Sequence, residues 1–184
     1  MEYEIIRSRR KTLSAQITGN RLVVRAPLRT TDGEIRQFLE KHRRWLEKHL
    51  AEAQALEEAK TGLRRLTQAE IARLAEQAKQ VIPARAAYYA PLIGVDYGRI
   101  TIRCQKTRWG SCSAKGNLNF NCLLMLAPPG VIDSIVVHEL CHRKVMNHSA
   151  RFYAEVTRVL PEYRQYERWL KDHGAMILAM AEDA

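Results

Sequence analysis

The sequence predicts an α+β fold in which a small antiparallel or mixed β-sheet packs with helices. Two segments, near residues 15 and 100, alternate apolar and polar side chains as half-buried strands do. Two others begin with capping boxes and continue with apolar residues at helical spacing. An apolar run at residues 131–137, preceded by Pro128-Pro129-Gly130, indicates a buried helix. At 184 residues, the chain is long enough to bury a core.

The first 28 residues predict a three-stranded β unit. Residues 13–17 alternate between apolar and polar side chains, and 22–24 form the returning strand. Gly19 and Asn20 between them are typical of a two-residue type II′ turn. Residues 3–7 supply the third strand.

A capping box at Thr31 and Glu34 predicts a helix over residues 32–50 that frays toward residue 60. Its apolar stripe contains Ile35, Phe38, Leu39, Trp45, Leu46 and Leu50. Because an aromatic residue on an apolar stripe usually packs inside, we expect Trp45 in the core. Stacking of Trp45 on a nucleic-acid base is the alternative.

A second capping box, at Thr67 and Glu70, opens another helix, which Pro83 kinks or restarts and Gly94 ends. The pattern of residues 99–103 and 117–121 predicts two strands, with the turn between them at 114–116. The buried helix and two further helices, at 150–160 and 162–173, complete the chain.

The motif His138-Glu139-Leu140-Cys141-His142 predicts a metal site at the end of the buried helix. Histidines four residues apart share one helical face, where both imidazoles can bind one zinc ion. Glu139 lies about 100° round the helix, where its carboxylate can take a proton from a water molecule at that ion. The alternative is that these histidines are ordinary polar residues.

A catalytic zinc ion usually has three protein ligands, and His148 is our leading candidate for the third. On a continued helix it would point about 120° away from the first two, so we expect the helix to end between Lys144 and Asn147. Asn147 can adopt the left-handed conformation of such an ending, and Ser149 would cap the next helix. The alternative third ligand is a downstream carboxylate, Glu155 or Glu162.

The net charge of +10, from 30 basic and 20 acidic residues, indicates an anionic partner, with nucleic acid not favoured. The four cysteines show no paired C-x-x-C spacing, and we find neither a signal peptide nor an apolar run long enough to span a membrane. We therefore expect free thiols, a cytoplasmic location and no membrane contact.

No acidic residue occurs between Tyr97 and Ile132, and this basic stretch leads into the predicted metal helix. Arg108 can donate two parallel hydrogen bonds to a phosphate or carboxylate, Ser111 can donate another, and Trp109 can stack on a base or aromatic side chain. We therefore expect these three residues to bind substrate on one wall of the cleft. A hairpin with solvated basic residues is the alternative.

These motifs resemble those of the YgjP-like metal-dependent hydrolases of the zincin superfamily, and the resemblance spans nearly the whole chain. It rests on residues 106–113, 136–142, 147–149 with Phe152, and 160–163 with Trp169 and Leu170. The resemblance implies a zincin-like α+β domain with one zinc ion per chain, held by His138, His142 and His148 around Glu139. Metzincin proteases share the histidine spacing but carry glycine where this chain has Val145, so their turn geometry is not implied.

We expect an N-terminal β subdomain at 1–30, a helical segment at 31–95 and a zincin-like metal-binding catalytic region at 96–184, forming one compact unit. The resemblance implies a peptidase-like enzyme in which metal-activated water attacks an amide bond. The alternative, also associated with this family, is pyrophosphohydrolysis of nucleoside triphosphates such as UTP, with basic residues on the phosphates and Mg²⁺ held with the nucleotide. A binding module with a structural zinc is disfavoured, because such a site is closed by four protein ligands.

Overall fold

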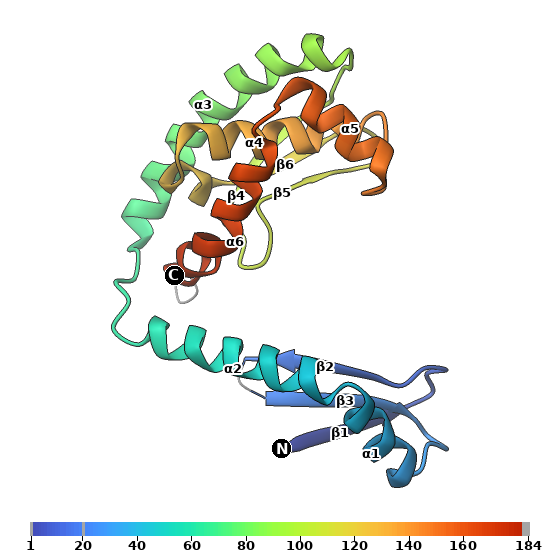
Figure 1. Cartoon of the computed structure of the whole chain (residues 1–184). Helices are drawn as coiled ribbons and strands as arrows, with labels where there is room; N and C mark the ends of the chain where they lie inside the picture. Colours follow the sequence, from blue (N-terminus) through green and yellow to red (C-terminus); the bar gives the residue numbers. More distant parts are fainter. Residues whose placement is uncertain (1, 20, 182–184) are drawn as a thin grey trace. The chain divides into compact units, whose positions relative to one another are not determined.

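The computed structural model describes residues 2–19 and 21–181. The chain divides into two compact units, Met1–Leu63 and Arg64–Ala184 (Figure 1). Each unit contains one three-stranded sheet together with helices, which confirms the predicted α+β class. Within the described residues, no helix combines the length and the hydrophobicity that crossing a membrane requires.

Unit 1 is the predicted β unit followed by helices, and its elements are β1 (Tyr3–Ser8), β2 (Ser14–Thr18), β3 (Arg21–Pro27), α1 (Asp32–Lys41) and α2 (Arg43–Lys60). Strand β3 is central, parallel to β1 and antiparallel to β2. One face of the sheet packs against the helices through Leu22, Val24 and Ala26. The predicted type II′ turn includes Asn20, which lies outside the described residues.

The single helix predicted over residues 32–50 is wrong, because the chain breaks into α1 and α2 at His42. The predicted capping box at Thr31 and Glu34 does open α1. At His42 the backbone takes φ −107° and ψ 11°, outside the helical range, and the imidazole Nδ1 lies 2.8 Å from the Phe38 carbonyl. In α2, Leu46 is buried, whereas Trp45 is 51% exposed, so the expectation that Trp45 lies in the core is wrong.

Unit 2 contains α3 (Gln68–Ile93), β4 (Ile100–Arg103), β5 (Gly110–Cys112), β6 (Leu118–Asn121), the 3₁₀ helix η1 (Cys122–Leu126), α4 (Pro129–Cys141), α5 (Ala150–Val159) and α6 (Tyr163–Ala179). The capping box at Thr67 and Glu70 and the ending of α3 at Gly94 are confirmed, and Gly94 is left-handed (φ 80°). The helix is continuous through Pro83, so of the two predicted effects, a kink or a restart, the restart does not occur.

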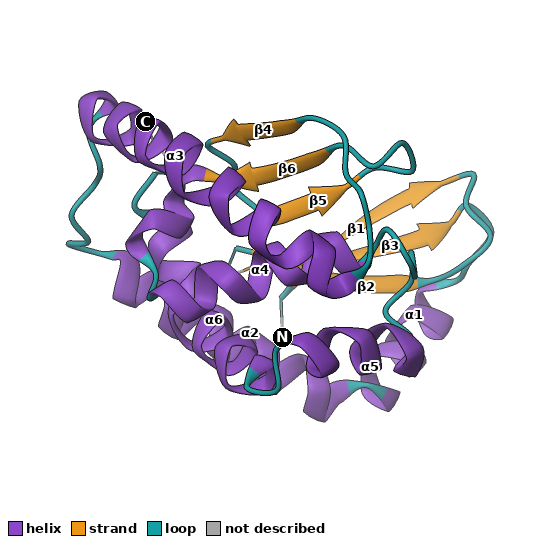
Figure 2. Cartoon of the chain, turned by 90° about the horizontal axis from the view of Figure 1, so that it is seen from above, coloured by secondary structure: helices purple, strands orange, loops and turns teal. Residues whose placement is uncertain are grey.

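The sheet of unit 2 differs from the predicted pair of strands. Strands β4 and β6 are parallel neighbours, and the residues predicted as the turn between them, 114–116, instead connect β6 to the unpredicted strand β5 (Figure 2). Strand β5 is antiparallel to β6 and forms one edge of the sheet. A three-residue strand is too short for its periodicity to be visible in the sequence.

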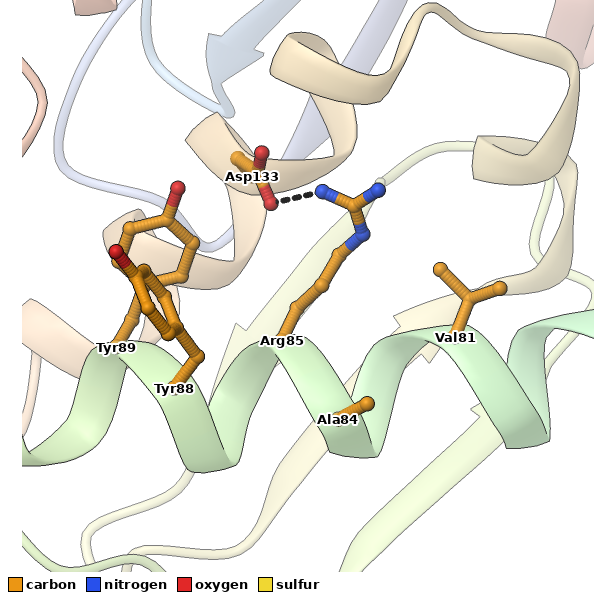
Figure 3. A pocket seen from close by; sticks show the side chains of 6 residues that line it. All are labelled: Val81, Ala84, Arg85, Tyr88, Tyr89 and Asp133. Atoms are coloured by element: carbon orange, nitrogen blue, oxygen red, sulfur yellow. Dashed lines mark hydrogen bonds and ion pairs between the residues drawn. The ribbon is translucent and has the colours of Figure 1, made fainter.

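Helix α4 lies in the core of unit 2, where it contacts α3, α5, α6 and β5. Its Val131, Val136, Val137 and Leu140 are buried, as the apolar run predicted. On the side facing α3, Asp133 forms an ion pair with Arg85 beside Tyr88 and Tyr89 (Figure 3). This contact between two helices helps to fix the orientation of α4, whose last turn carries His138 and Glu139.

Candidate metal centre

The helix that carries the metal motif ends earlier than predicted. Its last residue is Cys141, and His142 is the C-cap, with helical φ −62° and ψ −18°. The predicted ending between Lys144 and Asn147 is therefore wrong, and Asn147 is not left-handed, because all described residues with positive φ are glycines. His142 still follows His138 by one helical turn, since the turn after α4 begins with helical geometry.

The segment after α4 brings the third histidine back toward the first two. Helix α5 begins at Ala150 as predicted, with Ser149 at the N-cap position, although the Ser149 side chain makes no capping hydrogen bond. Lys144, within the turn, forms an ion pair of 3.2 Å with Glu155 of α5. This pair spans the turn on which His148 lies, and so holds that turn against α5.

The imidazoles of His138, His142 and His148 converge on one point. The Nε2 atom of His138 lies 3.2 Å from the Nε2 of His142 and 3.0 Å from the Nε2 of His148. One nitrogen from each of the three rings lies within 4.8 Å of the other two, which makes this group a candidate metal site. The ring of Phe152, fully buried, stacks 4.5 Å from that of His142 and closes the site from behind.

In His138 and His142, the Nδ1 atom has a hydrogen-bond partner, which leaves the Nε2 atom available as a metal ligand. The Nδ1 of His142 lies 3.1 Å from the Val145 carbonyl, which can only accept, so Nδ1 carries the proton and the neutral ring has its lone pair on Nε2. The Nδ1 of His138 lies 2.9 Å from the Tyr163 hydroxyl. Such partners fix the orientation and tautomer of metal-binding histidines.

The three histidines fit a divalent metal ion. Tetrahedral zinc with Zn–N distances of about 2.0–2.1 Å requires its ligand nitrogens to be about 3.3–3.4 Å apart, close to the observed spacing. Burial, followed by the neighbouring His142 and His148, lowers the pKa of His138 to about 3, and burial also lowers the pKa of His142. Both rings are therefore neutral at pH 7, as metal binding requires.

The carboxyl group of Glu139 lies in the same pocket, against the backbone of β5. A Cβ atom placed on Gly110 would be 2.6 Å from Oε1 of Glu139, so only glycine leaves room for this side chain. Burial raises the pKa of Glu139 to about 8, partly offset by the positive charge of Arg108. In the absence of a cation, the buried carboxyl group thus favours its protonated form.

The pocket is lined by Gly110, Ser111 and Cys112 of β5, by His138, Glu139 and His142, and by Met146 and His148. Of the three predicted substrate-binding residues, Ser111 is part of this lining. Arg108 is exposed and is not part of it, although its charge acts on Glu139. Trp109 instead lies against Gly174 of α6, where an added Cβ would be 3.2 Å from the indole.

The carboxylates considered as alternative ligands lie elsewhere. Glu155 pairs with Lys144 and Arg158, and Glu162 is an exposed residue at the N-cap of α6. Two features of the site were not predicted from the residues: the Tyr163–His138 hydrogen bond and the fit of Gly110 against Glu139. Tyr163 directly follows Pro161-Glu162 at the start of a helix, but only the folded chain shows which histidine it meets.

Comparisons with known proteins found a matching family and two similar solved structures. A family model described as the YgjP-like, metallopeptidase domain matches residues 11–74 and 61–173. Among solved structures, the metallopeptidase zymogen of Pyrococcus abyssi abylysin shares 22% identity at a TM-score of 0.46, and that of Methanocaldococcus jannaschii jannalysin shares 20% at 0.45. Each alignment covers 50% of this chain and 94% of the solved chain.

A comparison with curated protein sequences found no significant match. The family match, by contrast, extends over both units and includes the three histidines, Glu139 and strand β5. The protein is therefore a metal-dependent hydrolase that belongs to the YgjP-like, metallopeptidase-domain family.

Proposed function

We propose that the protein is a zinc-dependent peptidase. The observation that carries this proposal is the convergence of three imidazoles on one point, beside a glutamate and an edge strand. Three histidine ligands with an open fourth position are typical of catalytic zinc sites. Bound zinc would act as a Lewis acid toward the carbonyl group of the scissile bond and the attacking water.

Glu139 is the proposed general base and acid. Its carboxylate takes the proton from the attacking water and returns it to the leaving amine, so the residue ends the reaction in the state in which it began. Gly110 behind it and the burial of its side chain hold the carboxyl group in one position. A fixed base needs little reorganisation at the moment of proton transfer.

Strand β5 is the proposed guide for an extended peptide. In the antiparallel ladder, Trp109 and Ser113 exchange backbone hydrogen bonds with β6, at Asn121 and Asn117. Because the pattern alternates, the backbone N–H and C=O groups of Gly110 and Cys112 point away from β6, toward the free edge. A peptide that pairs with this edge lies along the pocket lining, with main-chain recognition independent of its side chains.

The proposed substrates include peptides that carry negative charge near the scissile bond. Arg108 lies close enough for its charge to lower the pKa of Glu139, and the stretch from Tyr97 to Ile132 contains no acidic residue. A cationic side chain at the rim of a cleft attracts anionic substrates and adds a charge-assisted hydrogen bond on binding.

The test combines metal analysis with two classes of substrate. Protein purified without added metal should contain one zinc per chain, and His148→Ala should lose it under mild chelation. The zinc-loaded protein is then incubated in parallel with unstructured peptides and with the four ribonucleoside triphosphates. Cleavage of peptides alone supports the proposal. Hydrolysis of the triphosphates without peptide cleavage would show that the same site serves phosphoanhydride chemistry.

A further inference from the structure

Two cysteines outside the metal site follow the ends of neighbouring strands. In the parallel ladder of β4 and β6, Ile100 pairs with Leu118, and the register continues to the pair Arg103 and Asn121. The residue directly after each of these two strand ends is a cysteine, Cys104 after β4 and Cys122 after β6. Neighbouring strands in a sheet are about 4.7–4.9 Å apart, which lies within the 4.4–6.8 Å that a disulfide requires between its Cα atoms.

The two cysteine side chains are neighbours at this end of the sheet. Cys104 directly follows β4, and Cys122 is the first residue of η1, directly after β6. The two thiols interact directly, since the Cys122 side chain is hydrogen-bonded to Cys104. Burial and this neighbour together raise the pKa of Cys122 to about 12.

The two cysteines differ in access to solvent. Cys104 is exposed, whereas Cys122 is fully buried in the core of unit 2. An exposed thiol can be attacked or can attack first, and a buried thiol next to it can then close the bond without itself meeting a reagent. We infer that Cys104 and Cys122 form a reversible disulfide when the protein meets a small-molecule disulfide such as oxidised glutathione.

The proposed reaction is two successive thiol–disulfide exchanges. The Cys104 thiolate, having released its proton to solvent, attacks one sulfur of oxidised glutathione and expels one glutathione thiolate. The Cys122 thiol then loses its proton and attacks the Cys104 sulfur of the mixed disulfide, which expels the second glutathione thiolate. In total the protein loses two protons and two electrons, and the two expelled glutathione thiolates take up two protons, so one oxidised glutathione becomes two molecules of glutathione.

The disulfide would close the loop that forms the wall of the metal site. Residues 105–121 lie between the two cysteines and include β5. Asn121 already fastens this loop, because its Nδ2 donates hydrogen bonds to the carbonyl groups of Gln105 (2.7 Å) and Arg108 (3.0 Å). A disulfide at Cys122, the residue after Asn121, would reinforce the attachment that these hydrogen bonds already provide. Since it removes freedom from the unfolded chain, the melting temperature should rise by about 5–10 °C.

The experiment treats the full chain with oxidised glutathione and analyses it by intact mass, peptide mapping and thermal unfolding. The expected product has lost two hydrogen atoms in mass, contains a linked peptide pair of Cys104 and Cys122, and has the higher melting temperature. A reducing agent should restore the original mass and melting temperature.

Two variants provide the comparison. Cys104→Ser, at an exposed position, should fold normally but neither lose two hydrogens nor gain thermal stability. Cys112→Ser, which removes a half-buried cysteine from the same loop, should still form the disulfide. Accumulation of a stable glutathione adduct on Cys104 without ring closure would overturn the inference. So would a linked pair that involves Cys112 or Cys141, or absence of any reaction at Cys104.

Discussion

The hydrogen bond between Tyr163 and His138 gives the metal site a support that the histidine spacing does not reveal. Tyr163 is buried, and its hydroxyl lies 2.9 Å from Nδ1 of His138. With Nε2 on a metal ion, Nδ1 donates its proton to this hydroxyl and the ring is held in one orientation. Burial raises the pKa of Tyr163, which keeps the hydroxyl neutral.

We predict that Tyr163→Phe weakens metal binding by about 10–100-fold, because the ring still packs but its hydrogen bond is lost. Competition with a chromogenic chelator measures the affinity. Tyr88→Phe is the matched control, since the Tyr88 side chain is on α3 and is 65% exposed. Equal metal affinities for Tyr163→Phe and the parent protein would contradict this role.

Substitution of Arg108 tests whether the basic stretch from Tyr97 to Ile132 distinguishes substrates by charge. Replacing Arg108 by Ala should raise KM or lower turnover for anionic substrates by about 1.5–3 kcal/mol, the range of a charge-assisted hydrogen bond, and leave metal content unchanged. Lys should rescue only in part, because it keeps the charge without the planar fork. Arg103→Ala, exposed on β4, is the control. An unchanged ratio of neutral to anionic substrate cleavage in Arg108→Ala would refute the idea.

At the scale of elements, the proposed catalytic geometry depends on the close approach of β5 to α4. A Cβ atom on Gly110 would lie 2.6 Å from Oε1 and 2.8 Å from Cγ of Glu139. We predict that Gly110→Ala displaces the Glu139 carboxyl group and lowers kcat/KM by about 10²-fold, the cost of a misplacement of about 1 Å.

Metal content measured on the same sample distinguishes displacement of Glu139 from loss of the site, because the three atoms nearest to this Cβ position all belong to Glu139. Gly33→Ala in α1 is the matched control, since the nearest atom to its added Cβ is 3.8 Å away. Activity of Gly110→Ala equal to that of Gly33→Ala would show that the contact has no catalytic consequence.

The capping box that begins α3 predicts a pH dependence of stability. Hydrogen bonds from Thr67 and Arg64 lower the pKa of Glu70 from 4.5 to about 2. A lowered pKa in the folded state means that Glu70 contributes its full stabilisation above about pH 4.5 and loses it as the pH falls through about 2. Glu70→Gln should therefore be less stable than the parent at pH 7, with the difference narrowing toward pH 2.

Chemical unfolding at a series of pH values measures this difference. Glu76→Gln serves as the control on the same helix, because Glu76 forms only an exposed i,i+3 pair with Lys79. A stability difference between Glu70→Gln and the parent that stays constant from pH 7 to pH 2 would rule out the linkage.

The elements also show what the sequence can and cannot predict. Both capping boxes, the helix start at Ala150 and the helix end at Gly94 depend on neighbouring residues, and all were predicted. The parallel pairing of β4 with β6 depends on contacts between residues 18 positions apart, and was not. At the break, the His42 side chain bonds to the Phe38 carbonyl, a contact that the apolar pattern does not encode.

At the scale of the whole molecule, the metal site could be predicted because its main spacing is local. His138, Glu139 and His142 occupy one turn at the end of α4, whose position follows from the apolar run. His148 was predicted as the third ligand, and it lies with the other two histidines although the helix ends earlier than expected. The positions of Arg108 and Trp109 depend on how the loop before β5 folds. The sequence did not predict that Arg108 is exposed or that Trp109 lies against α6.

The family match covers residues of both units, whereas every residue of the candidate metal centre lies in unit 2. The net charge of +10 is divided between the units, so a general attraction to anions does not by itself identify the site. The central claim therefore concerns the chemistry of unit 2, in which three histidines hold the metal ion and Glu139 transfers the proton.

The most direct measurement of this claim is the metal content and peptidase turnover of Glu139→Gln, determined on one sample. Glutamine keeps nearly the same shape but cannot accept the proton, so zinc should stay at one per chain while turnover falls by about 10²–10⁴-fold. Turnover close to that of the parent protein, with zinc bound, would contradict the account and leave Glu139 without a catalytic role.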